Sequence, residues 1–172
     1  MKVLTFGDGC RDDSHPHQIV IMGDFVWVVD LGCDSIYTYR IEEGQLTRLS
    51  STAVGAGFGP RHMAISGDIA IVACELQSHV LVFNINPDGS LEQTQDLQYA
   101  SADGNKGAEI LVHNGYVYAS SRGVGVVVVY SMENNQLTRI QELALDGTWP
   151  RSIAIKEDIM LAADKNGESI QV

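Results

Sequence analysis

Basic residues are scarce in this sequence: 11 Lys and Arg stand against 22 Asp and Glu, a formal net charge of −11 over 172 residues. A surface with this balance repels phosphate groups, so nucleic acids and anionic membranes are not expected as partners. Long apolar runs are also absent, and residues 1–9 lack the basic start and apolar core of a secretory signal. These absences predict a cytoplasmic protein that binds neither nucleic acid nor membrane.

Cysteine is rare as well, with three widely spaced residues, Cys10, Cys33 and Cys74. An odd number without a close pair fits neither a disulfide framework nor a CxxC metal or redox site. We therefore interpret all three as reduced, small apolar side chains. His15 and His17 lie near Cys10 but in no standard ligand spacing, so the sequence predicts no metal site and no cofactor.

Helical periodicity is missing, because no window carries a sustained apolar stripe with a period of about 3.6 residues. Instead, four stretches align with one another at offsets of 44, 47 and 43 residues. They begin at His17, Arg61, Ala108 and Arg151. Each stretch contains short β-rich runs separated by two-residue turn signals, of which Gly23-Asp24 is the first. Strands and tight turns are therefore expected throughout.

The repeated unit of about 45 residues, with four antiparallel strands, predicts a β-propeller blade. The first unit places strands over 17–22, 25–31, 35–41 and 45–53, after an outer strand over 2–6. We predict an all-β chain forming one partial propeller over residues 1–172, with about 3.5 to 4 blades of a probable seven. A barrel or a two-sheet sandwich is the competing fold, but neither predicts the repeat. Because the last repeat stops in mid-strand, we expect a piece of a longer ring; two copies closing one ring is an alternative.

Several phrases in the chain resemble the lactonase family of seven-bladed β-propellers, which includes propeller-type 6-phosphogluconolactonase and carboxy-cis,cis-muconate cyclase. The phrases are HPHQ at His15, VDLG at Val29, GPRH at Gly59, CEL at Cys74, SSRG at Ser120 and WPRSIAI at Trp149. The resemblance implies a seven-bladed ring whose central cleft binds an anionic lactone or muconate without a metal. It also implies active-site roles for His17, Arg61, Glu75 and Arg122.

Hairpin geometry independently groups charged residues. In a hairpin that turns at residues 67–68, the start of the first strand and the end of the second lie at one edge, so Arg61 and Glu75 share that edge. The same register places His17 opposite Asp30. Successive repeats then gather six residues at one face of the ring: His17, Arg61, Glu75, Glu109, Arg122 and Arg151.

The residue types at this face suit the hydrolysis of a lactone. We expect Arg61 and Arg122, with Arg151 and Glu109 beside them, to bind a phosphate or carboxylate and to stabilise the developing oxyanion. Small anionic lactones are therefore the expected partners. The open edges of a partial ring also predict self-association.

Proton transfer in such a reaction requires a general base. Glu75 and His17 are the candidates, and a carboxylate at Asp30 would orient His17 as in a catalytic triad. We interpret His62 and His79 as surface or packing residues. The predicted reaction is metal-free hydrolysis of 6-phosphogluconolactone; a muconate-type cyclase and a non-catalytic binding scaffold are the alternatives.

Overall fold

The computed structural model describes residue 10 and residues 13–100 and 104–172. Within these ranges the chain forms fifteen strands and no helix, as the sequence predicts. None of these residues therefore belongs to a helix that could cross a membrane. The outer strand predicted over 2–6 lies outside the described residues.

The strands form four antiparallel sheets, and in each the strands follow one another in chain order. The first sheet contains β1 (Pro16–Met22), β2 (Phe25–Asp30), β3 (Ser35–Glu42) and β4 (Gln45–Ala53). The second contains β5 (Pro60–Ser66), β6 (Ile69–Cys74), β7 (His79–Ile85) and β8 (Leu91–Gln98). The third contains β9 (Lys106–His113), β10 (Tyr116–Arg122), β11 (Val126–Glu133) and β12 (Gln136–Ala144). The last has three strands, β13 (Pro150–Lys156), β14 (Ile159–Asp164) and β15 (Ser169–Gln171).

Two-residue turns join the first two strands of each sheet, at the positions the sequence predicts. In the first two sheets, Gly23 and Gly67 begin these turns with φ of +58° and +55°. Such left-handed backbone matches the twist of the flanking strands in a tight hairpin, and glycine adopts it without steric cost. The repeat in the sequence is therefore a repeat of four-stranded units.

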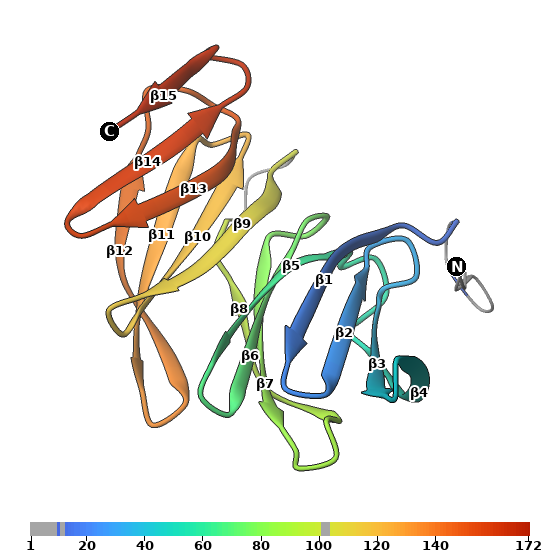
Figure 1. Cartoon of the computed structure of the whole chain (residues 1–172). Coiled ribbons are helices and arrows are strands. Elements are labelled where there is room, and N and C mark those ends of the chain that lie inside the picture. The colour runs from blue at the N-terminus through green and yellow to red at the C-terminus, as the bar shows by residue number, and fades with distance from the viewer. Residues whose placement is uncertain (1–9, 11–12, 101–103) are drawn as a thin grey trace.

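The four sheets follow one another around an open arc, from the first sheet to the last (Figure 1). The first strands of neighbouring sheets touch: β1 contacts β5, β5 contacts β9, and β9 contacts β13. Consequently these first strands line the inner side of the arc, and strands β4, β8 and β12 lie at its outer side. This is the blade arrangement expected of a β-propeller.

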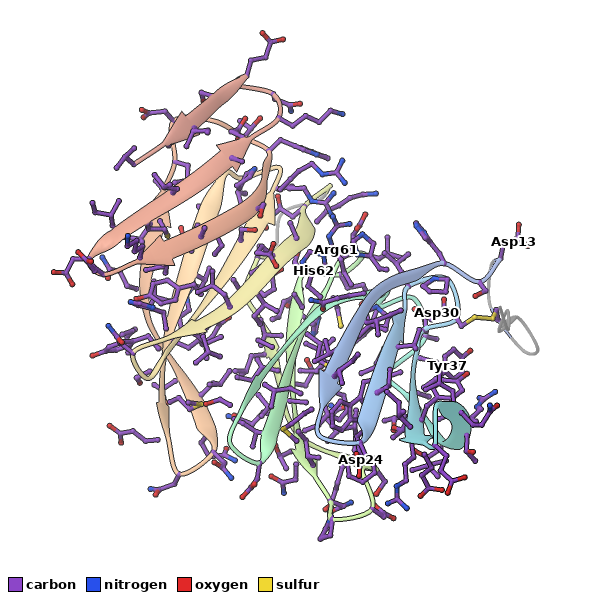
Figure 2. The ribbon with its side chains drawn as sticks, in the orientation of Figure 1. Asp13, Asp24, Asp30, Tyr37, Arg61 and His62 are labelled. Atoms are coloured by element: carbon purple, nitrogen blue, oxygen red, sulfur yellow. A yellow bond between two sulfur atoms is a disulfide. The ribbon has the colours of Figure 1, made fainter. Side chains whose placement is uncertain are left out.

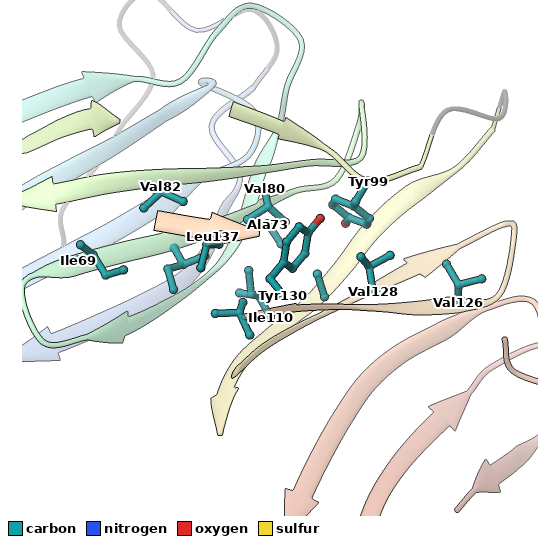
Figure 3. Close-up of a cluster of buried hydrophobic side chains, with 13 residues drawn as sticks. Ile69, Ala73, Val80, Val82, Tyr99, Ile110, Val126, Val128, Tyr130 and Leu137 are labelled. Carbon is teal, nitrogen blue, oxygen red and sulfur yellow. The ribbon is translucent and has the colours of Figure 1, made fainter. Parts of the chain in front are cut away.

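Apolar side chains fill the space between neighbouring sheets. Between the second and third sheets, Ile69 and Val82 belong to the same buried cluster as Ile110 and Tyr130 (Figure 3). A second cluster joins the first and second sheets and includes Trp27, which is fully buried. Burial of apolar surface on these faces is what holds successive blades at a fixed angle.

One expectation about the cysteines is wrong: Cys10 and Cys33 form a disulfide, with their Cα atoms 4.1 Å apart. The two residues are 23 positions apart in sequence, and next to β1 the backbone of His15 accepts a hydrogen bond of 3.0 Å from Leu31 N, just after β2. Cys74 is free and buried, and burial raises the pKa of its thiol.

Candidate functional site

An irregularity recurs where the first strand of each sheet begins. In β1, Pro16 pairs with Asp30 and Gln18 with Val29, which leaves His17 as an extra residue in a β-bulge. Arg61 in β5 and Arg151 in β13 are extra residues of the same kind, and β9 has a register shift at the corresponding place. Bulges redirect side chains and are frequent beside active sites.

Because of the bulge in β1, His17 does not lie opposite Asp30, and the predicted pairing of these residues is wrong. Asp30 lies opposite Pro16, and its carboxylate accepts hydrogen bonds from Ser14 Oγ at 2.6 Å, His15 N at 2.9 Å and Cys33 N at 3.0 Å. Asp30 therefore fixes the loops at the end of the first sheet and does not orient His17. The prediction failed because it counted an unbroken register from the turn.

Three residues from two sheets meet at the predicted charged edge. Glu75 follows β6, and its Oε2 lies 2.5 Å from Arg61 Nη1 and 2.9 Å from Arg122 Nη2. Lys106 Nζ lies 3.7 Å from the other carboxylate oxygen of Glu75. Arg61 and Glu75 thus share an edge as predicted, and Arg122 reaches the same carboxylate from β10. We call Arg61, Glu75 and Arg122 the arginine–glutamate cluster.

The cluster is largely removed from solvent, with Arg61 only 5% and Arg122 only 4% exposed. Burial lowers the pKa of Arg61, although the charge of Glu75 opposes this change. For Glu75, burial alone would raise the pKa, but Arg122 and Arg61 outweigh it and hold the pKa below the usual value. Glu75 is therefore ionised at neutral pH and is a weak base.

Arg122 is held in place from two directions. Its Nη2 donates a hydrogen bond of 2.6 Å to the carbonyl of Gly107, and its guanidinium carbon lies 5.6 Å from the centroid of the Trp149 ring. A side chain at residue 107 would overlap Tyr99 Oη and the carbonyl of Cys74, so only glycine allows this close approach. Within the described chain, Nε of Arg61 and of Arg122 is buried without a partner.

A second group of hydrogen bonds joins side chains on the first strands of the second, third and fourth sheets. His62 Nδ1 is 2.6 Å from Glu109 Oε1, and Ser152 Oγ donates to Glu109 Oε2 at 3.1 Å. Burial acts to raise the pKa of Glu109, but the hydrogen bond and charge of His62 lower it overall. Glu109 is thus paired with His62 rather than with the arginines, and neither His62 nor Ser152 was singled out from the sequence as a site residue.

His17 lies between the two groups. Its ring centroid is 4.9 Å from that of His62 and 5.8 Å from that of His15. Burial is the main cause that lowers the pKa of His17 to about 4, and the charges of Arg61 and His62 add to it. His17 is therefore neutral at pH 7, and its buried Nδ1 has no partner among the described residues. Figure 2 shows Arg61 and His62 together where β5 approaches β9, away from Asp30.

The remaining predicted residue, Arg151, lies in β13 and is exposed. Its charge contributes to the lowered pKa of Arg61, so it adds to the positive potential of the same site. Three further cations, Arg61, Arg122 and Lys106, lie within 4 Å of one ionised carboxylate, Glu75. In a chain of net charge −11 this local excess of positive charge is suited to binding an anion. Across residues 13–100 and 104–172, no three His, Cys, Asp or Glu residues are placed to hold a metal ion.

The depressed pKa of His17 predicts a pH dependence of stability. Between pH 6.5 and about 4 the unfolded chain binds a proton at this residue that the folded chain does not. The free energy of unfolding should therefore fall as pH decreases through this window, by about 1–2 kcal/mol after allowance for solvent screening. Urea titrations at pH 7 and pH 4.5 measure this change. In His17→Gln the decrease should be smaller by that amount; an equal decrease would show that His17 is not its source.

Comparison with known proteins agrees with this architecture. The model of the family described as "Lactonase, 7-bladed beta-propeller" matches residues 5–172. A 6-phosphogluconolactonase from Bacillus subtilis (strain 168) is 31% identical over 140 residues, with 74% of this chain and 40% of that protein covered. The solved structure of a candidate 6-phosphogluconolactonase from Bacteroides fragilis superposes with a TM-score of 0.87 at 25% identity, over 96% of this chain and 53% of that chain.

The periplasmic gluconolactonase of Pseudomonas aeruginosa shares the fold, with a TM-score of 0.84 at 24% identity, over 91% of this chain and 49% of that chain. The chain thus spans from 40% to 53% of the length of these three relatives. The family match covers nearly all of the chain, and the four-stranded blades, their order and their arc are those of a propeller. The chain therefore belongs to the lactonase family of seven-bladed β-propellers.

Proposed function

We propose that the protein hydrolyses an anionic sugar-acid lactone, most specifically 6-phosphogluconolactone to 6-phosphogluconate. The observation that carries this proposal is the buried arginine–glutamate cluster, in which two guanidinium donors share one carboxylate while Lys106 and Arg151 add positive charge nearby. Such donors bind phosphate and carboxylate groups through charge-assisted hydrogen bonds. The Bacillus subtilis relative, a 6-phosphogluconolactonase, supports the same reaction.

The residues of the cluster have distinct roles in this proposal. Arg61 and Arg122 bind negative charge, both on the substrate and on the oxyanion that develops when water attacks the lactone carbonyl. Glu75 holds the two guanidiniums in place, because it is ionised and bonded to both. Lys106 and Arg151 draw the anionic substrate towards the site. The positive potential repels divalent cations, which favours a reaction without a metal.

The test is to compare the hydrolysis of two lactones that differ only in a phosphate. If the cations recognise that phosphate, kcat/KM for 6-phosphoglucono-δ-lactone should exceed that for glucono-δ-lactone by about 10- to 100-fold, the contribution of one or two charge-assisted hydrogen bonds. Hydrolysis can be followed at low buffer concentration with a pH indicator, with correction for spontaneous ring opening. Equal rates would indicate that the phosphate is not recognised. Absence of turnover for both would favour a binding scaffold.

A further inference from the structure

One layer of side chains on the inner strands is not used by the anion site. Four consecutive first strands carry, at equivalent positions of the repeat, Gln18, His62, Glu109 and Ser152. Gln18 Oε1 accepts a hydrogen bond from Met63 N at 2.5 Å. The other three form the continuous line from His62 through Glu109 to Ser152. This layer directly follows the bulge positions that carry His17, Arg61 and Arg151.

Hydrogen bonds hold Glu109 at both carboxylate oxygens and at its backbone amide. Oε1 faces His62 and Oε2 accepts from Ser152 Oγ, while the Glu109 amide donates to Ser120 Oγ at 3.0 Å. A carboxylate held in this way fixes the orientation of the imidazole and stabilises its protonated form. Because Nδ1 of His62 is engaged with Glu109, Nε2 is the ring nitrogen that remains for proton transfer.

The two bases suggested by the sequence are poorly suited by comparison. Glu75 is bonded to two guanidiniums, so protonating it would break both ion pairs. His17 has no hydrogen-bonded carboxylate among the residues that the structure describes, and its pKa of about 4 makes it a weak base at neutral pH. His62 has such a partner, is adjacent in sequence to Arg61 and has its ring 4.9 Å from that of His17. Its side chain is 18% exposed, so water can reach it.

We propose that His62 is the general base of the lactone hydrolysis proposed above, with Glu109 and Ser152 as its positioning residues. Nε2 of His62 accepts a proton from a water molecule as the water oxygen bonds to the lactone carbonyl carbon. The bond between that carbon and the ring oxygen then breaks. The ring oxygen takes the proton from His62 and becomes the hydroxyl of the product. The new carboxylic acid loses its own proton to solvent, and His62 returns to its starting state.

The test is the pH dependence of kcat/KM for 6-phosphoglucono-δ-lactone in the full chain and three variants. His62→Asn should lower kcat about 100- to 1,000-fold, the usual contribution of a general base. It should also remove the acid limb of the pH profile, which is the decrease of kcat/KM at low pH. Glu109→Gln should lower kcat about 10-fold and move the acid limb to lower pH, because protonated His62 loses its carboxylate. The titratable groups that face His62 are Glu109 of β9 and His17 of β1. His17→Gln should therefore keep the acid limb.

A matched control lies on the outer strands of the second sheet, where His79 of β7 and Asp96 of β8 form a similar histidine–carboxylate pair. His79→Asn and Asp96→Asn should leave the kinetic profile unchanged. If His62→Asn retains wild-type kcat and acid limb, His62 is not the base, and the lactonase proposal stands without it. If the acid limb disappears in His17→Gln instead, the role belongs to His17. If the wild-type chain hydrolyses neither lactone, both proposals are overturned.

Discussion

Replacing Arg122 with methionine should lower the free energy of unfolding by about 3 kcal/mol, because a buried carboxylate then loses its principal counter-charge. Among the charges that hold down the pKa of Glu75, that of Arg122 is the largest. The substitution also leaves the Gly107 carbonyl without the guanidinium donor that it has in the folded chain. Methionine keeps the apolar stem of the side chain but lacks the guanidinium that faces the Trp149 ring, so this contact is lost together with the charge.

The same variant should bind 6-phosphogluconate roughly 10- to 100-fold more weakly, as expected from the loss of hydrogen bonds to a charged group. Urea denaturation and isothermal titration calorimetry measure the two effects. Arg139→Met is the control, since Arg139 pairs with Glu142 on the outer strand β12, where its side chain is 45% exposed. This control should lower the free energy of unfolding by less than about 1 kcal/mol and leave the binding of 6-phosphogluconate unchanged. Equal losses in both variants would show that the arginine–glutamate cluster has no special role.

The blades were predictable from the sequence because the repeat is nearly regular. Offsets of 44, 47 and 43 residues, with turn residues at matching places, determine strand number, order and pairing. The disulfide was not predictable, because the approach of Cys10 to Cys33 depends on how a loop folds back, and no periodicity records that. The sequence spacing suggested isolated thiols, whereas the fold brings two of them together.

The site was only partly predictable, and the reason is the recurring bulge. Counting residues from a hairpin turn correctly placed Arg61 near Glu75, because Glu75 lies beyond the paired strand and its long side chain reaches across the edge. The same counting wrongly placed His17 opposite Asp30, because one extra residue shifts every position before it. The sequence led us to interpret His62 as a surface or packing residue, because its partner lies on the next blade. The offset from His62 to Glu109 is nevertheless the repeat offset of 47 residues, and this signal was available.

Replacing Glu75 with glutamine removes the acidic member of the arginine–glutamate cluster. The free energy of unfolding of this variant should depend strongly on added anions. Glutamine keeps the shape but removes the charge shared by Arg61 and Arg122, so two buried guanidiniums then repel each other. The expected loss in the free energy of unfolding is about 3–5 kcal/mol, the usual cost of breaking a buried ion pair. Because an anionic ligand binds only the folded chain, added 6-phosphogluconate should restore part of this loss. The free energy of unfolding should rise more on addition of 6-phosphogluconate in the variant than in the wild-type chain.

The pH dependence gives this prediction a second, independent readout. The pKa of Glu75 is lowered in the folded chain, so its contribution to stability is complete above its unfolded pKa of about 4.3 and disappears as pH falls through the folded value. The difference between wild type and Glu75→Gln should therefore narrow as pH falls below about 4.3, and it should vanish only below the lowered pKa of folded Glu75, where its carboxyl group is neutral like the glutamine amide. Glu142→Gln, on the exposed outer strand, is the matched control and should show neither anion recovery nor narrowing. A difference that persists unchanged at low pH would mean that Glu75 stabilises the fold by its shape and hydrogen bonds, and that the guanidiniums do not depend on its charge.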